Sequence, residues 1–265
     1  MLRAIPTDGL SLTIETLGSG PPLVFAHGLT GTRQGILRQL APLTDHFQVI
    51  VYDQRGHGDS RPVTDPTQYN ADRMAADLAA VLDALDIERA IVGGESMGAA
   101  TTLLFALRWP ARVEKLLLTA PAFGEAPNTE SPRLKEMAAG IASLGMAAFL
   151  DLAAVRQRGQ LGWPPEAVAH VAESFRAHDP ASLVTALQTV SDWRPLPDLS
   201  VLADLACPTC IIAWDGDPLH PLALARQVAA TLPHAELHLI PTLPAVFVQP
   251  TLVGEVYRRF LLPEG

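Results

Sequence analysis

The chain has 265 residues, 48% of them hydrophobic and 18% charged, which predicts one soluble globular domain with a large core. Its formal net charge of −9 and its lack of a basic stripe argue against a nucleic-acid partner, whose phosphates attract Lys and Arg. No apolar run has the length of a secretion signal or of a membrane span, so we expect a cytoplasmic protein with no membrane partner.

Short apolar runs alternate with helical patterns along the chain, which predicts a parallel sheet whose strands are joined by helical crossovers. The expected strands lie at 11–18, 23–28, 47–53, 90–95, 113–121, 209–215 and 236–241. Apolar residues spaced by three and four predict helices at 71–87, 221–232 and 251–262.

The alternation stops between the strands at 113–121 and 209–215. Residues 125–195 carry helical patterns without a convincing strand, and turn-rich stretches bound them at both ends. We therefore predict an α/β core made of residues 1–124 and 196–265, with a helical cap at 125–195 that covers a site at the edge of the sheet.

The clearest chemical signal is the pentapeptide Gly94-Glu95-Ser96-Met97-Gly98, which follows a predicted strand and opens a predicted helix. A GxSxG sequence in this context forms a sharp turn that exposes the serine hydroxyl, and the glycines Gly94 and Gly98 permit the close approach of strand and helix. We interpret Ser96 as a nucleophile at the N-terminus of a helix.

A second glycine-rich turn, His27-Gly28-Leu29-Thr30-Gly31, follows the strand at 23–28. Acyl transfer requires backbone amides that receive the negative charge of the oxyanion, and we assign the amides of Leu29 and Met97 to that role. His27 is interpreted as a residue that braces the loop by hydrogen bonding.

Two aspartates follow the strand at 209–215, in the sequence WDGDPLHP. A triad acid lies just beyond a strand end, so we favour Asp217 as the acid and expect Asp215 to cap the turn. The two cysteines, Cys207 and Cys210, lead into an apolar run and are interpreted as ordinary core residues rather than a redox pair.

These segments together resemble the α/β-hydrolase superfamily, in its branch of small esterases, lactonases and cofactor-free haloperoxidases. The resemblance lies in HGLTG, YDQRGHGDS, GESMG, WDGDPLHP and QPTLVGEVYRRFL. It covers the two core segments, whereas the cap is similar to that branch only in its placement and in the stretch HDPASLVTALQTVSDWRPLPDL. The resemblance implies an eight-stranded, mostly parallel sheet, a structural role for His57, and a triad in the chain order Ser, Asp, His.

The resemblance also implies a catalytic histidine shortly after the last strand, and the chain has none there. Residues 240–250 read IPTLPAVFVQP. Counting forward from Ile240 places the expected histidine at Ala245, whereas counting back from Pro250 places it nearer Leu243. The forward count is preferred, because the loop after the base varies in length more readily than the strand end.

Other histidines are weaker candidates for the base. His220 follows Asp217 closely, but DPLHP has the pattern of a helix start, and His238 belongs to the last strand. His170 and His178 lie in the predicted cap and would reach the site only if the cap folds down over it. We therefore expect Ser96 to lack its base and to be a weak nucleophile.

The sequence thus predicts a serine hydrolase that acts on a small carboxylic ester or lactone through an acyl-enzyme, inactive or impaired because position 245 is alanine, either natural or engineered. The alternative is a ligand-binding protein or pseudoenzyme that uses the pocket under the cap. We expect no cofactor and no metal, since there is no nucleotide-binding GxGxxG and no metal-ligand spacing, and no pattern indicates an oligomeric state.

Overall fold

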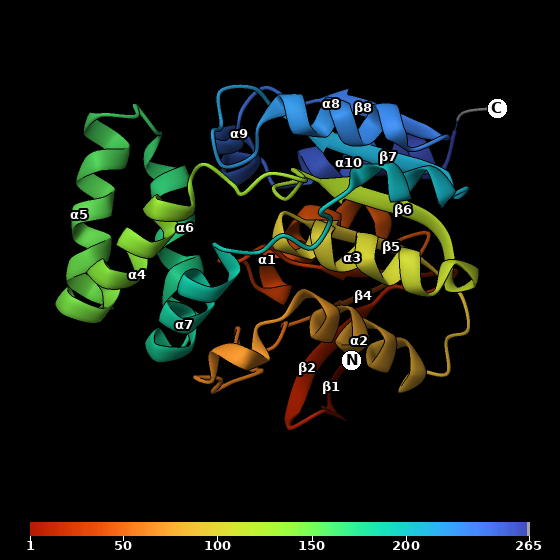
Figure 1. Cartoon of the computed structure of the whole chain (residues 1–265), viewed down its shortest axis with the longest axis horizontal. Helices are drawn as coiled ribbons and strands as arrows, with labels where there is room; N and C mark the ends of the chain where they lie inside the picture. Colours follow the sequence, from red (N-terminus) through yellow and green to blue (C-terminus); the bar gives the residue numbers. More distant parts are fainter. Residues whose placement is uncertain (264–265) are drawn as a thin grey trace.

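The computed structural model describes residues 1–263 and contains one twisted sheet with helices on both faces (Figure 1). Its eight strands follow the order β1-β2-β4-β3-β5-β6-β7-β8. In chain order they are β1 (Leu2–Thr7), β2 (Leu10–Leu17), β3 (Pro22–Ala26), β4 (Gln48–Tyr52), β5 (Ala90–Glu95), β6 (Val113–Thr119), β7 (Thr209–Ala213) and β8 (Ala235–Leu239). Strand β2 pairs antiparallel with β1 and β4, and the remaining pairs are parallel, which confirms the predicted fold class.

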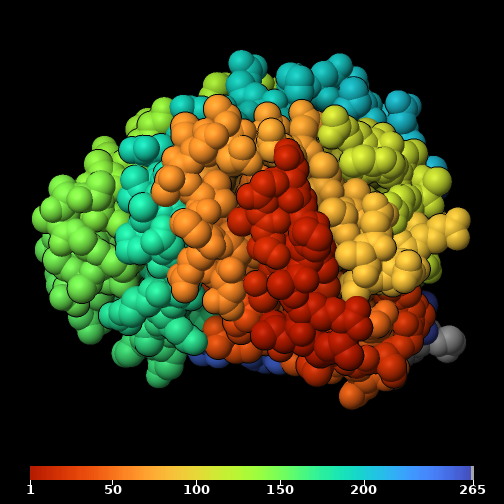
Figure 2. Space-filling view, turned by 90° about the horizontal axis from the view of Figure 1, so that it is seen from below, coloured from red at the N-terminus to blue at the C-terminus, as the bar shows by residue number. Residues whose placement is uncertain are grey.

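The seven predicted strands are present, and the eighth is β1, which the sequence analysis did not find. Its sequence, LRAIPT, has a single buried residue, Ile5, so no apolar run marks it. Figure 2 shows the N-terminal hairpin in red, lying across one face of the molecule beside the orange segment that follows β4. An edge strand of this kind is held by its hydrogen bonds to β2 rather than by burial.

Two apolar layers enclose the sheet because successive residues of each strand point to opposite faces. In β3, Val24 and Ala26 belong to one buried cluster, and Leu23 and Phe25 belong to the other. The first layer is covered by α2 (Ala71–Asp83), α3 (Met97–Arg108) and α8 (Leu222–Thr231), and the second by α1 (Arg33–Leu40) and α10 (Thr251–Leu261). The predicted helices at 71–87, 221–232 and 251–262 correspond to α2, α8 and α10.

Residues 125–195 form four helices and, over all of these described positions, no strand. These cap helices are α4 (Ser131–Leu144), α5 (Met146–Gly159), α6 (Pro165–Arg176) and α7 (Pro180–Val190). Figure 1 shows them in green at one end of the sheet, with α5 outermost. The helical content agrees with the expectation, and the boundaries of the core and cap segments stay a prediction.

A short helix, α9 (Leu243–Val248), occupies the segment after β8 where the resemblance implied a catalytic histidine. Thr242 caps its N-terminus, because the threonine hydroxyl accepts a hydrogen bond from the amide of Ala245. Within residues 1–263, no helix has both the length and the hydropathy of a membrane span.

Candidate active site

Ser96 lies at the junction of β5 and α3. Its backbone has φ of 54°, in the left-handed region that a residue with a Cβ rarely adopts, and its amide donates to the carbonyl of Thr119 at 2.9 Å. Strand and helix approach closely here, since a Cβ on Gly98 would lie 2.1 Å from the carbonyl oxygen of Ala26. The GxSxG sequence therefore forms the strained turn that it predicted.

A histidine contacts the serine, and it is His220. The imidazole Nε2 lies 2.8 Å from Ser96 Oγ, and Nδ1 lies 2.7 Å from Asp217 Oδ2. Because the carboxylate accepts the Nδ1 proton, Nε2 is free to accept the proton of the serine hydroxyl. Ser96, Asp217 and His220 thus form a continuous hydrogen-bonded chain in the order Ser, Asp, His along the sequence.

The environment of Asp217 keeps its carboxyl ionised. Burial by itself would raise the pKa of Asp217, but hydrogen bonds from His220, Trp214 Nε1 and the amide of Leu219 lower it to about 2. The Trp214 indole donates at 3.0 Å to the same oxygen, Oδ2, that contacts the histidine. A carboxylate held in this way orients the imidazole and stabilises its protonated form.

The expectation that no histidine reaches Ser96 is wrong, and the reason is local. Residues 217–220 form a turn, closed by the amide of His220 donating to the carbonyl of Asp217 at 3.2 Å, and α8 begins only at Leu222. The turn directs the imidazole back toward β5, whereas the helix start expected from DPLHP would have fixed a different direction. The proximity of His220 to Asp217 in sequence was the signal available for finding it.

Ala245, the expected position of the missing histidine, lies in α9 and lines the same cavity as Ser96. Its methyl group offers no proton acceptor. Asp215 accepts a hydrogen bond from the amide of Gly216 at 2.8 Å, which is the turn-capping role that the sequence predicted for it.

Leu29 and Met97 carry the two predicted oxyanion amides; Met97 follows Ser96 in the chain, and Leu29 lines the same cavity as Ser96. Met97 is the first residue of α3, and Leu29 follows β3 in the glycine-rich turn that Gly31 closes by donating to the carbonyl of Gly28. Neither the Leu29 nor the Met97 amide donates a hydrogen bond to any described residue. Both donors are therefore available to an oxygen bound beside Ser96.

His27 and His57 brace this turn from behind. His27 Nε2 accepts from the amide of Gln54 at 2.9 Å, and its Nδ1 donates to the carbonyl of Gly28 at 2.7 Å. His57 Nε2 lies 2.8 Å from the carbonyl oxygen of Leu29. Burial lowers the pKa of both imidazoles, which favours their neutral form as supports of the loop.

The histidines of the cap do not contact Ser96. His170 stacks on Phe247 of α9 with ring centroids 4.9 Å apart, and it lines the cavity. His178 lies between α6 and α7, where its Nδ1 accepts from the amide of Gly58 at 3.1 Å and its Nε2 lies 3.2 Å from the carbonyl oxygen of Thr30.

A cavity of about 1590 Å³ opens above Ser96, between the C-terminal edge of the sheet and the cap helices. Its walls come from α4, α5, α6 and α9 and from the loops after β3 and β7. The cap contributes mainly apolar side chains, which include Met137, Phe149, Leu150, Trp163 and Phe175. The polar residues at its base are Ser96, His220, Asp217, Glu95 and Gln39.

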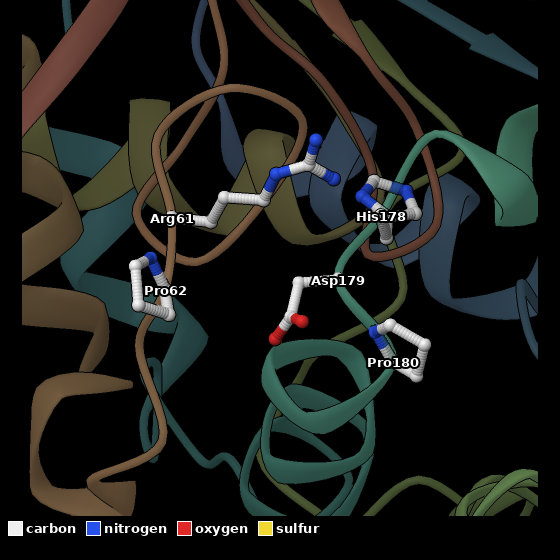
Figure 3. Close-up of a pocket in the computed structure, with 5 residues that line it drawn as sticks. All are labelled: Arg61, Pro62, His178, Asp179 and Pro180. Atoms are coloured by element: carbon white, nitrogen blue, oxygen red, sulfur yellow. The ribbon is translucent and has the colours of Figure 1, made fainter.

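A second, shallow hollow lies between the loop after β4 and the link from α6 to α7. Its lining consists of Arg61, Pro62, His178, Asp179 and Pro180 (Figure 3). Asp179 is occupied as the N-cap of α7, since it accepts from the amide and the hydroxyl of Ser182. No member of the Ser96 chain lines this hollow, whereas Ser96, Asp217 and His220 all line the larger cavity.

No group of three or more His, Cys, Asp and Glu residues within residues 1–263 has an arrangement that could hold a metal ion. Cys207 and Cys210 are both free thiols, and burial raises the pKa of Cys210 to about 12. Cys210 lies in the buried core, which agrees with its interpretation as a core residue, whereas Cys207 is only partly buried.

The relatives of the chain are hydrolases and haloperoxidases. It is 31% identical over 238 residues to a protein named putative carbamate hydrolase RutD from Shigella flexneri serotype X, with 88% of this chain and 87% of the relative covered. It is 26% identical over 242 residues to 3-oxoadipate enol-lactonase 2 of Acinetobacter baylyi, with 89% and 87% covered. A putative non-heme haloperoxidase of Mycobacterium phage D29 is 38% identical over 119 residues, which span 44% of this chain and 42% of that protein.

Solved structures show the same architecture. A hydrolase from Pseudomonas aeruginosa superposes with a TM-score of 0.80 at 26% identity, and 98% of each chain is covered. The sequence profile of the alpha/beta hydrolase fold matches residues 21–248 of this chain. The chain therefore belongs to the α/β-hydrolase family of enzymes.

Proposed function

We propose that this hydrolase cleaves a small carboxylic ester or lactone through a covalent acyl-enzyme on Ser96, with His220 as the base. The observation that carries the proposal is the hydrogen-bonded chain from Ser96 Oγ through His220 to Asp217. Both the pseudoenzyme alternative and the expectation of an impaired enzyme rested on the absence of a histidine beside Ser96. With His220 in contact with Ser96, that reason no longer applies.

The reaction proceeds in two halves. Ser96 Oγ attacks the carbonyl carbon as its proton passes to His220 Nε2, and the oxyanion is received by the amides of Leu29 and Met97. The C–O bond to the leaving alcohol breaks, and the alcohol takes the proton from His220. A water molecule then loses a proton to His220 and attacks the acyl carbon, which releases the acid and returns the proton to Ser96.

The cavity and the relatives support the substrate class. A volume of about 1590 Å³ with apolar walls suits an uncharged ester or lactone that carries a hydrocarbon group. The similarity to a protein named enol-lactonase favours a lactone, and the similarity to one named putative carbamate hydrolase makes a carbamate a useful further substrate in the screen. All three are cleaved by attack on a carbonyl carbon.

The test compares two positions for the base. We expect His220→Ala to lower kcat for p-nitrophenyl acetate by roughly 10⁴-fold, similar to Ser96→Ala, because removal of a triad member costs about that much. We expect Ala245→His to produce no increase. The partly exposed His238 of β8, replaced by Ala, is the matched control and should retain wild-type turnover.

A fluorophosphonate probe gives a second readout of the same proposal. An activated hydroxyl reacts rapidly with such a probe, so we expect stoichiometric labelling of Ser96 in the wild-type protein. We expect His220→Ala to abolish this labelling. Turnover that survives in His220→Ala and rises by orders of magnitude in Ala245→His would contradict the assignment of the base.

A further inference from the structure

Glu95, the residue before the nucleophile, places a carboxyl group at the base of the cavity. It is the last residue of β5 and lines the cavity together with Ser96. Its Oε1 lies 3.8 Å from the position that a Cβ on Gly28 would take, which puts the carboxyl beside the predicted oxyanion loop. The chemistry of the Ser96 chain does not use this group.

Only one of the two Glu95 oxygens has a protein partner. Gln39 of α1 donates from Nε2 to Glu95 Oε2 at 3.1 Å, and no described residue donates to Oε1. Gln39 itself is 6% exposed, and its Oε1 has no hydrogen-bond partner within residues 1–263. A buried acceptor without a partner, such as Gln39 Oε1, is costly for a fold, and Glu95 is partly exposed in the cavity beside Ser96. The pair therefore has hydrogen-bonding capacity that is available to a ligand.

The surroundings of Glu95 and Gln39 indicate which kind of substrate group would bind there. Burial raises the pKa of Glu95, and Gln39 and His220 only partly oppose this effect. A carboxylate of the substrate would meet a second carboxyl group here, whereas a hydroxyl or an amide N–H would supply the donor that Oε1 lacks. The cavity walls are mainly apolar, and Glu95 is the residue that directly precedes Ser96 in the chain, so its carboxyl is a polar contact close to the serine.

We infer that Glu95, held by Gln39, forms a specificity subsite that binds an uncharged hydrogen-bond donor, a hydroxyl or an amide N–H, close to the scissile carbonyl of the substrate. The inference rests on the proposed esterase function and deepens it by naming a substrate feature. Glu95 acts in binding and orientation and takes no proton from the reacting atoms.

The experiment uses two matched pairs of esters, measured by pH-stat at neutral pH. Ethyl 3-hydroxybutyrate against ethyl butyrate tests a donor on the acyl side, and 2-hydroxyethyl butyrate against propyl butyrate tests one on the alcohol side. For each pair the readout is the ratio of kcat/KM for the hydroxylated ester to that for its apolar match. A ratio within one variant cancels losses of folded protein and general damage to the site.

In one of the two pairs, Glu95→Leu is expected to lower this ratio by about 10-fold to 100-fold, the usual effect of a hydrogen bond to an ionisable group. Glu95→Gln keeps the size of the side chain and an acceptor oxygen, and its ratio should lie between those of wild type and Glu95→Leu. The exposed Glu114 of β6, replaced by Leu, is the control and should keep the wild-type ratio.

The outcomes separate this inference from the proposed function. Hydrolysis of the parent esters that depends on Ser96, with ratios unchanged in both Glu95 variants, would overturn the subsite and leave the esterase function standing. If neither pair is hydrolysed faster than by Ser96→Ala, the proposed function fails and the subsite fails with it. Should Glu95→Leu not fold, an unchanged ratio in Glu95→Gln is sufficient to overturn the inference.

Discussion

At the scale of residues, the two side chains that we propose as acid and base come from one turn. Asp217 and His220 are three residues apart, and the same turn is closed by their backbone hydrogen bond and by the Nδ1 contact at 2.7 Å. A histidine on the segment after β8 would depend on the packing of α9, whereas His220 lies on the same loop as Asp217. This arrangement explains how a histidine reaches Ser96 although position 245 is alanine.

The lowered pKa of Asp217 predicts a pH-dependent part of the stability. The folded value of about 2 lies below the ordinary value of 3.8, so the contribution is present above pH 4 and is lost as the pH falls toward 2. We expect the ionised Asp217 to contribute about 2 kcal/mol to the unfolding free energy at pH 5, and about 1 kcal/mol of this contribution to be lost at pH 3.

The measurement is urea unfolding of wild type and Asp217→Asn at pH 5 and pH 3. The difference in unfolding free energy between the two proteins should narrow at the lower pH, because the variant has no carboxyl group to protonate. A difference that stays constant or widens would show that the charge of Asp217 does not stabilise the fold.

At the scale of elements, the strand-to-helix junction tolerates no additional atoms. A Cβ on Gly94 would lie 2.2 Å from the carbonyl oxygen of Gly98, and one on Gly98 would lie 2.1 Å from that of Ala26. These neighbours are backbone atoms, which cannot move without displacing β3 or α3. The two glycines are therefore required for packing, independently of the chemistry of Ser96.

We expect Gly98→Ala to lower the unfolding free energy by at least about 2 kcal/mol, because the backbone must shift to admit the methyl group. Gly159→Ala, at the end of α5, is the matched control, since no atom lies within 4 Å of the added Cβ. The control should leave stability unchanged or raise it by up to about 1 kcal/mol. The measurement is thermal unfolding of wild type and of the two variants. A melting temperature of Gly98→Ala equal to that of wild type would show that the junction accommodates the methyl group with little loss of stability.

At the scale of the whole molecule, the cap is fastened to the core near the oxyanion turn. Ser174 of α6 donates its hydroxyl to the carbonyl of Thr30, and His178 contacts the backbone of Thr30 and Gly58. Since Thr30 belongs to the turn that carries Leu29, the placement of the cap and the geometry of the predicted oxyanion site are connected.

The His178 contact predicts that acid weakens the fold. Its Nδ1 accepts a hydrogen bond and so must be unprotonated, and burial, aided by the nearby His57, lowers the pKa of His178 to about 3. The folded value lies below the ordinary 6.5, so stability present above pH 6.5 declines as the pH falls toward 3.

From pH 7 to pH 4.5, we expect wild type to lose about 2 kcal/mol more unfolding free energy than His178→Gln, whose side chain does not titrate in this range. The exposed His46, replaced by Gln, serves as the control and should follow the wild-type profile. Parallel pH profiles for wild type and His178→Gln would refute a neutral, buried His178.

Sequence patterns alone predicted the alternating strands and helices, the sharp turn at Ser96, the placement of Asp217 rather than Asp215 beside the site, and the helical character of residues 125–195. Each of these follows from local properties: apolar periodicity, the glycines of a tight turn, and the position of a side chain just beyond a strand. The edge strand β1 escaped detection because its hydrogen bonds to β2, rather than an apolar pattern, define it.

Which histidine contacts Ser96 is apparent only in the folded chain. The direction of the His220 imidazole depends on the path of the 217–220 turn and on the place of β7 two strands from β5 in the sheet, and neither is encoded in the spacing of residues along the chain. The hydrogen bond between Glu95 and Gln39 likewise joins two segments that are 56 positions apart in the chain. Contacts between distant segments are set by the packing of complete elements, so their chemistry becomes visible only in the folded protein.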